Sequence, residues 1–164
     1  MEYYFTADEH YGHNNIIKYC HRPFKNVKEM NEYIINQHNS VVKPASDVCT
    51  IHAGDFTLNG KSYADSIIKQ LNGQHLFIRG SHDYWLPKSS PMIIERTIHK
   101  HFVVICHYAM RTWHKSHYGS LQLYGHSHGN LSPLNNQLDI GVDTNEFKPY
   151  SFVDILIKIE GTRL

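Results

Sequence analysis

Aspartate and histidine residues recur in five short clusters along the chain, each directly after an apolar segment. The clusters lie at residues 8–10, 54–55, 80–83, 107 and 125–128. Their carboxylate oxygens and imidazole nitrogens, with no thiolate among them, suit Mn²⁺, Fe, Zn²⁺ or Ni²⁺ better than Ca²⁺ or a structural zinc site. The strong ligands among them are Asp8, His10, Asp55, His107, His126 and His128. Because this set exceeds what one tetrahedral ion uses, we expect two ions about 3.5–4 Å apart that share a carboxylate.

The apolar segments that precede these clusters are expected to be short strands. Residues 3–6, 48–51, 76–78, 102–105 and 121–124 are rich in β-branched and aromatic side chains. Several are continuous apolar runs, which are typical of strands covered on both faces. In open α/β sheets, ligand sites assemble at the carboxyl ends of the strands. One such motif is more often a surface loop or a core-lining pair, but five in succession at strand ends indicate a metal site.

Helical periodicity predicts the remaining elements. Apolar side chains at helical spacing favour helices at 27–41, closed by Pro44, at 64–71 and at 152–159. Ser151 and Asp154 form a capping-box pattern at the last of these, although a strand fits residues 155–159 almost as well. A weaker strand is expected at 138–142. Strands alternating with helices indicate an α/β layered fold, and the absence of repeats and linkers predicts a single domain over residues 1–164.

Composition argues against several classes of protein. The chain has 16 basic and 15 acidic residues and a formal charge of +1, so tight binding to duplex nucleic acid is not expected. Its 14 histidines are dispersed, which indicates metal or acid–base chemistry rather than a tag. Cys20, Cys49 and Cys106 form no C-x-x-C motif and are expected to be reduced thiols of a cytoplasmic protein. Neither a signal peptide nor a membrane segment is predicted.

The five clusters, in this order, resemble the signature of the calcineurin-like metallophosphoesterases. That signature reads D-x-H, G-D, G-N-H-D/E, a lone H and G-H-x-H, and it spans residues 8–128 here. Residues 11–13, 22–24 and 123–129 further resemble the small bacterial and phage phosphoesterases of this family. The resemblance implies a four-layer α-β-β-α sandwich with a dimetal site on loops at one edge.

The resemblance also implies a role for each metal ligand. One ion is assigned to three residues, Asp8, His10 and His128. The second ion is assigned to His107 and His126, and Asp55 is assigned as the bridge between the two ions.

Three residues of the third cluster, at 80–83, complete the implied site. His82 would stabilise the phosphate and protonate the leaving oxygen, and Asp83 would orient His82. Ser81 stands where the family has an asparagine ligand of the second metal. A serine hydroxyl is shorter than the asparagine side chain and a poorer neutral ligand than its carbonyl oxygen, so weaker binding of the second ion is expected.

These residues together predict a metal-dependent phosphoesterase, with two divalent ions of which Mn²⁺ is the first choice. A hydroxide bridging the ions would attack phosphorus in line and an alcohol would leave. A chain of this size lacks a cap domain, and an open site favours phosphodiesters, such as nucleotides or nucleic-acid ends, over small phosphomonoesters. Two alternatives remain: a fold-retaining binding or scaffold module, favoured by Ser81, and a plain metal-binding or sensing protein. The sequence leaves the oligomeric state open.

A few further polar residues have both a functional and a structural interpretation. His13 lies just before Asn14, an expected helix cap, and could face the substrate. Arg22 and Arg111 could clamp phosphate oxygens as bidentate forks, although surface salt bridges are the simpler interpretation. His52 precedes the second cluster and could orient one of the metal ligands.

Overall fold

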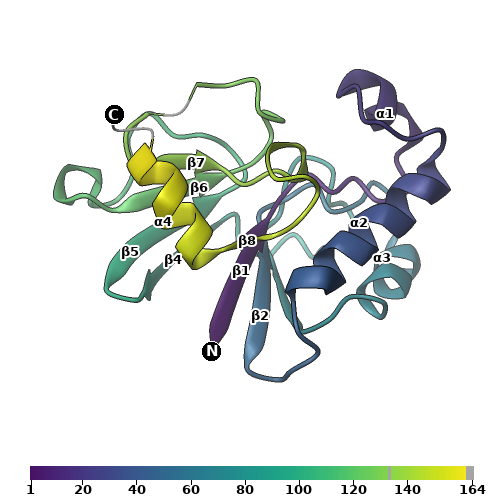
Figure 1. Ribbon diagram of the computed structural model, residues 1–164, viewed down its shortest axis with the longest axis horizontal. Helices are drawn as coiled ribbons and strands as arrows, with labels where there is room; N and C mark the ends of the chain where they lie inside the picture. Colours follow the sequence, from purple (N-terminus) through teal and green to yellow (C-terminus); the bar gives the residue numbers. More distant parts are fainter. Residues whose placement is uncertain (133, 162–164) are drawn as a thin grey trace.

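Two mixed β-sheets face each other across the interior (Figure 1). The computed structural model describes residues 1–132 and 134–161. The first sheet has the order β3-β2-β1-β8. Its strands β1 (Glu2–Thr6), β2 (Val48–His52) and β3 (Gln74–Phe77) run parallel, and β8 (Tyr150–Ser151) pairs antiparallel with β1.

The second sheet has the order β4-β5-β6-β7. Strand β4 (Ile93–Ile98) is antiparallel to β5 (His101–Cys106), whereas β6 (Leu121–Tyr124) and β7 (Gln137–Asp139) continue the sheet in parallel. Strands β1, β2, β5 and β6 each belong to a parallel pair, and the loop that follows each strand begins at the carboxyl end of that pair. This is the end at which the predicted ligands follow.

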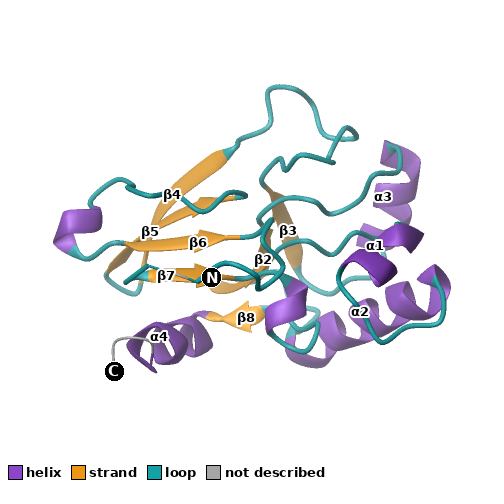
Figure 2. Ribbon diagram, turned by 90° about the horizontal axis from the view of Figure 1, so that it is seen from above, coloured by secondary structure: helices purple, strands orange, loops and turns teal. Residues whose placement is uncertain are grey.

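The helices pack against these sheets from different sides (Figure 2). Helices α1 (Asn14–Tyr19), α2 (Val27–Val41) and α3 (Lys61–Ile68) lie on one side of the first sheet, whereas α4 (Phe152–Gly161) lies beside β7 and β8. Helix α2 begins at a cap, because the side chain of Asn26 accepts a hydrogen bond from the backbone N–H of Glu29. Within the described part of the chain, no helix combines the length and the apolar character that a membrane span requires.

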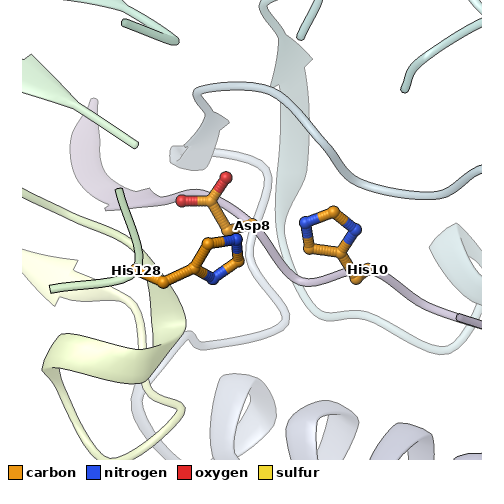
Figure 3. A group of neighbouring side chains, drawn as sticks. All are labelled: Asp8, His10 and His128. Atoms are coloured by element: carbon orange, nitrogen blue, oxygen red, sulfur yellow. The ribbon is translucent and has the colours of Figure 1, made fainter. Parts of the chain in front are cut away.

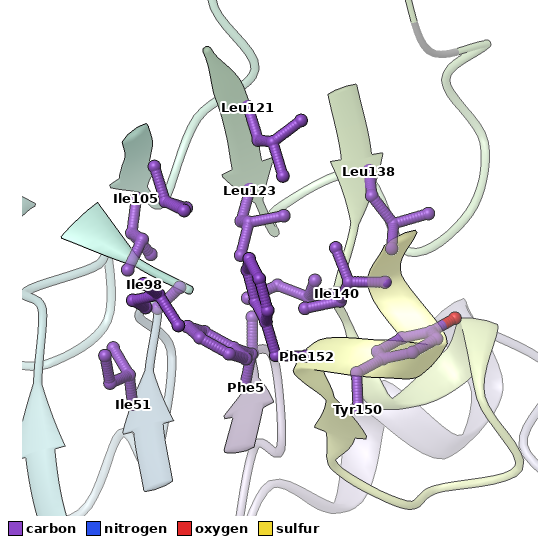
Figure 4. Packing of buried hydrophobic residues seen from close by; sticks show 14 of the residues in the cluster. Phe5, Ile51, Ile98, Ile105, Leu121, Leu123, Leu138, Ile140, Tyr150 and Phe152 are labelled. Carbon is purple, nitrogen blue, oxygen red and sulfur yellow. The ribbon is translucent and has the colours of Figure 1, made fainter. Parts of the chain in front are cut away.

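The main core lies between the two sheets (Figure 4). Phe5 and Ile51 of the first sheet meet Ile105 and Leu123 of the second, and Phe152 of α4 packs into the same cluster. Each of these side chains is buried, and burying one of this size stabilises the fold by about 1.5–3 kcal/mol. This core holds the strand ends of both sheets in fixed positions.

The structure confirms the predicted α/β sandwich of two sheets flanked by helices. The helix predicted at 27–41 and the strands predicted around 3–6, 48–51, 102–105 and 121–124 are present. The last predicted helix is a helix and not a strand, because Ser151 and Asp154 bond reciprocally at its start. The helix predicted at 64–71 begins and ends earlier, as α3, and the strand predicted at 138–142 is reduced to β7.

Three elements differ from the sequence-based expectation. Strand β4 carries Glu95 and Arg96 and alternates between exposed and half-buried side chains, so it lacks a continuous apolar run. Strand β8 has two residues, and α1 has six, which is too short for a periodic pattern. The cap of α1 is His13 in extended conformation, and Asn14 is the first helical residue rather than the cap.

Candidate metal centre

The loops that follow β1, β2, β5 and β6 are joined to one another by backbone hydrogen bonds. The N–H of Asp8 donates to the carbonyl of Gly54, and the N–H of His10 donates to the carbonyl of Asp55. Across the sheets, the N–H of His126 donates to Oδ2 of Asp8 over 2.8 Å. Clusters that are more than 100 residues apart in sequence are thus fixed at one place, as predicted from the strand ends.

Most of the predicted ligands share an unusual backbone conformation. The residues with a left-handed φ among them are Asp8 (59°), His10 (53°), Asp55 (58°), His126 (69°) and His128 (48°). Such a conformation costs a non-glycine residue roughly 1–2 kcal/mol, and aspartate and histidine adopt it more readily than most residues do. Such residues also occur in other turns of this chain, but five of the six predicted ligands share the conformation, which indicates that their placement serves a function.

The first ligand set consists of Asp8, His10 and His128, which lie beside one another in Figure 3. One ligand atom from each lies within 4.8 Å of the other two. Asp8 and His10 are buried. Burial lowers the pKa of His10 to about 2, which keeps its ring neutral and able to bind a cation. The resemblance implied this set, and the structure brings it together.

The second ligand set consists of Asp55, His107 and His126, whose ligand atoms also lie within 4.8 Å of one another. Nδ1 of His107 donates to the carbonyl of Ala53 over 2.9 Å, which leaves Nε2 as the ring nitrogen that can face an ion. That Nε2 lies 3.3 Å from Oδ2 of Asp55. His126 is exposed, which makes this set the more open of the two.

Asp55 lies between the two sets. Its Oδ2 is 3.8 Å from Nε2 of His10 in the first set and 3.3 Å from Nε2 of His107 in the second. Burial alone disfavours its charge, but His107 and the backbone N–H of His82 outweigh burial and lower the pKa of Asp55. The carboxylate is therefore ionised at the position from which one oxygen reaches both sets.

Buried atoms without hydrogen bonds test whether metal ions fit these sets. Among the described residues, such atoms include Oδ1 of Asp8, Nε2 of His10 and Nε2 of His107. A buried polar atom without a partner costs about 1–3 kcal/mol. All three belong to the ligand sets and offer electron pairs, so a divalent cation in each set would satisfy them. The residues present fit two such ions.

Buried carboxylates outside the ligand sets hold the loops in place. Asp83 accepts hydrogen bonds from the backbone N–H groups of Asp55, Phe56 and Gly80 and from the indole N–H of Trp85. The expectation that Asp83 orients the His82 ring is therefore corrected: both of its oxygens are engaged in fixing the loop of Asp55.

Two predicted histidines lie beside the ligand sets. The side chain of His82 is 39% exposed, and its Nε2 is 3.8 Å from Oδ2 of Asp55. Its ring centroid is 5.6 Å from that of His10 and 6.3 Å from that of His13. Nδ1 of His13 lies 3.4 Å from Nδ1 of His10, at the first ligand set. The structure thus brings both residues to the open side of the candidate site.

The two arginines predicted to clamp phosphate have different surroundings. Arg22 is buried and pairs with Asp143, so its guanidinium faces the interior and not a substrate. Arg111 is exposed and lines a cavity of about 350 Å³ with Met110 and Leu131. The buried ion pair with Asp143 leaves Arg22 no free face for a phosphate, and the phosphate contact expected of Arg111 stays a prediction.

Sequence reasoning missed Asp143 and named no partner for His52. Asp143 lies in a short 3-10 helix (Val142–Thr144) and accepts a hydrogen bond from Nδ1 of His128 over 2.7 Å. It follows the weak strand predicted at 138–142, so the rule of acidic residues at strand ends would have found it. His52 bonds to the buried Glu9 and to His75, and therefore supports a residue between two ligands rather than a ligand itself.

Comparison with known proteins gives the chain a family. Over 165 residues, 95% of this chain and 89% of the relative, it is 33% identical to the uncharacterized protein MJ1445 of Methanocaldococcus jannaschii. The chain belongs to the family of MJ1445. No family model matches the sequence.

One solved structure shares the fold of this chain. The protein of unknown function AQ665 from Aquifex aeolicus superposes with a TM-score of 0.74 at 22% identity, over 96% of this chain and 98% of that one. Two structures overlap less. A conserved protein from Streptococcus pneumoniae, described as a predicted phosphoesterase, has a TM-score of 0.41 at 13% identity over 77% of this chain and 62% of that one. A Vps29 mutant from Entamoeba histolytica has a TM-score of 0.45 at 11% identity over 78% and 65%.

Proposed function

We propose that the protein is a phosphoesterase that requires two divalent metal ions, Mn²⁺ in the first place, and hydrolyses phosphodiester bonds of nucleotides or nucleic-acid ends. The observation that carries this proposal is the position of Oδ2 of Asp55, 3.8 Å from Nε2 of His10 and 3.3 Å from Nε2 of His107. One carboxylate between two nitrogen-rich sets is the arrangement expected of a two-metal hydrolase.

The ligand sets define where the ions would bind. Asp8, His10 and His128 would hold one ion and His107 and His126 the other, with Asp55 shared. Bound divalent ions would supply Lewis-acid activation of the phosphoryl group and of water near neutral pH.

His82 is suited to act on the leaving group. Its side chain is 39% exposed at the edge of the site, so the ring can reach a bound ester. A protonated imidazole there would donate a hydrogen bond to a phosphoryl oxygen and pass a proton to the departing alkoxide. His13, whose ring lies 6.3 Å from the ring of His82, lines the same side and is proposed to contact substrate.

The openness of the site favours diesters. His126 is exposed and His82 is partly exposed, so the ligand sets face outward on this side. A phosphodiester carries a substituent on each side of the phosphorus and needs this room, whereas a small monoester gains little from it.

The test is hydrolysis of bis(4-nitrophenyl) phosphate in the presence of Mn²⁺, compared with the monoester 4-nitrophenyl phosphate. We expect turnover of the diester that exceeds turnover of the monoester and that is abolished by EDTA. Asp55→Asn keeps the shape of the side chain and removes its charge, and it should abolish turnover while the protein stays folded. Metal binding without turnover of either ester would contradict the proposed phosphoesterase activity and favour a binding or scaffold module.

A further inference from the structure

We propose that Arg22 and Asp143 are positioning residues that set the metal affinity of the first ligand set. This inference rests on the proposed function, because it requires that the set binds a metal ion. It replaces the role of substrate clamp expected for Arg22. The oxygens of Asp143 are engaged by Arg22 and His128, so we assign it no bond to the ion, and both residues act through the ligands that they hold.

Every N–H of the Arg22 guanidinium has a partner, although its side chain is fully buried. Nε and Nη2 donate to the two oxygens of Asp143 over 2.8 Å each, in a bidentate pair. Nη2 also donates to the carbonyl of Asp8 over 2.7 Å, and Nη1 to the carbonyl of Glu9 over 3.0 Å. The remaining N–H of Nη1 faces the sulfur of Met30. Arginine alone offers five donors in a fixed plane, so lysine cannot reproduce these contacts.

The carbonyl contacts of Arg22 fix the first ligand. Asp8 has a left-handed φ of 59°, a conformation that the chain does not adopt without support. Donors from one rigid plane hold the carbonyl oxygens of two consecutive residues, Asp8 and Glu9. Arg22 thereby fixes the loop that carries Asp8 and His10 at the end of β1.

Asp143 fixes the ring of His128. Both of its oxygens accept from the guanidinium of Arg22, in the bidentate geometry of an arginine–carboxylate pair. A carboxylate accepts hydrogen bonds and cannot donate, so Nδ1 of His128 must carry the proton in their 2.7 Å contact. Nε2 then holds the lone pair, and Figure 3 shows the other nitrogen of the ring on the side of Asp8 and His10. Asp143 thus selects the tautomer that binds metal.

The ion pair joins segments that are 121 residues apart in sequence. Arg22 bonds to the loop after β1, which carries Asp8 and His10, and Asp143 bonds to His128 in the loop after β6. The ion pair thereby links the two loops. The second set is held differently: His107 is oriented by a backbone carbonyl, and the exposed ring of His126 contacts the rings of His107 and Tyr108. A change at Arg22 or Asp143 should therefore affect one ion and not the other.

The experiment is an Mn²⁺ titration that counts free ion by electron paramagnetic resonance. Wild type is compared with Arg22→Lys, with the nearly isosteric Asp143→Asn, and with His128→Ala, which identifies the class of bound ion that belongs to the first set. Arg96→Lys is the control, because Arg96 is an arginine shielded in part from solvent that contacts Tyr3 at the start of β1 and none of the ligands. Melting temperatures in EDTA establish that each variant is folded.

We expect the affinity of the first-set ion to fall about 10–100-fold in Arg22→Lys and Asp143→Asn, the usual effect of losing a residue that orients a ligand. The other ion should keep its affinity, and Arg96→Lys should behave as wild type. If Arg22→Lys does not fold, the Mn²⁺ affinity of Asp143→Asn alone tests the inference. Unchanged affinity in a folded Asp143→Asn, or an equal loss of both ions, overturns the inference. Absence of Mn²⁺ binding in wild type instead overturns the proposed function.

Discussion

The hydroxyl of Ser81 donates a hydrogen bond to Oδ2 of Asp55 over 3.0 Å, with a longer contact of 3.3 Å to Oδ1. Ser81 therefore contacts the shared carboxylate at the position where the resembling family has an asparagine ligand. The second set is left with Asp55, His107 and the exposed His126 as its charged and imidazole ligands. We predict unequal occupancy, with the second ion the weaker, and activity that rises with Mn²⁺ into the millimolar range.

Ser81→Asn tests this prediction. The longer amide side chain should reach the second ion with its carbonyl oxygen and tighten that ion by about 10–100-fold. Ser81→Ala is the control, because it removes the hydrogen bond to Asp55 without supplying a ligand, and it should not tighten the ion. Bound Mn²⁺ per chain and diester turnover are followed together. Two equally tight ions in wild type, with no gain in Ser81→Asn, would show that the hydroxyl suffices.

His82→Ala should lower turnover while metal content stays intact. The expected loss is about 10²–10⁴-fold, the usual contribution of a positioned acid. It should be smaller for diesters with a nitrophenol leaving group than for those with an alkyl alcohol, because nitrophenolate needs little protonation. His117→Ala, an exposed histidine in the 3-10 helix Ser116–Tyr118, is the control and should retain full activity. An equal loss for both leaving groups would contradict the acid role.

Asp83→Asn should destabilise the fold. Each oxygen of Asp83 accepts from at least two N–H donors: Asp55 and Gly80 on Oδ2, and Phe56 and Trp85 on Oδ1. Whichever oxygen becomes an amide NH₂ then faces donors that it cannot accept from. At about 1–3 kcal/mol for each buried group left unsatisfied, we expect a loss of about 2–4 kcal/mol in the free energy of unfolding. Urea unfolding in EDTA measures it, and a loss below about 0.5 kcal/mol, the scale of neutral surface changes, would contradict it.

His38 should make stability depend on pH. Burial, with a smaller effect of the nearby His52, lowers the pKa of His38 to about 3, whereas the pKa of a histidine in an unfolded chain is about 6.5. Protonation therefore favours the unfolded chain, and the stability that neutral His38 contributes is lost as pH falls from about 6.5 toward 3. By linkage the loss is up to about 2 kcal/mol at about pH 5.

His38→Gln isolates this effect, because glutamine does not titrate and can still donate to the carbonyl of Asn72, which Nε2 of His38 contacts over 3.1 Å. Urea unfolding of both proteins in EDTA at neutral and acidic pH gives the comparison. The advantage of wild type over the variant should shrink as the solution becomes more acidic. A difference that does not change with pH would show that His38 is protonated equally in both states.

Much of the fold follows from local patterns in the sequence, because buried strands need apolar runs and amphipathic helices need periodicity. Helix α2 has both a cap at Asn26 and a full apolar face, so its bounds were predictable. Strand β4 was not, because it is an edge strand with Glu95 and Arg96 in its middle, and its pairing with β5 decides its conformation. Strand β8 depends on pairing with β1 in the same way.

The ligands were predictable because strand ends concentrate them, whereas the residues that hold them depend on long-range contacts. Nothing near Arg22 in sequence indicates that its partner is Asp143, and its charge by itself suggested a phosphate clamp. Asp83 likewise looked like a partner of its neighbour His82, but the backbone of the Asp55 loop occupies its oxygens. Hydrogen bonds between residues far apart in sequence depend on how the elements pack, and a local sequence pattern does not predict that packing.

The most direct measurement is the number of Mn²⁺ ions bound per chain in wild type and in Asp55→Asn, determined at equilibrium with the protein folded. Two ions in wild type, both bound more weakly in Asp55→Asn, are expected, because Oδ2 of Asp55 lies 3.8 Å from Nε2 of His10 and 3.3 Å from Nε2 of His107. A single ion in wild type, or two ions whose affinities do not change in Asp55→Asn, would contradict a shared dimetal centre.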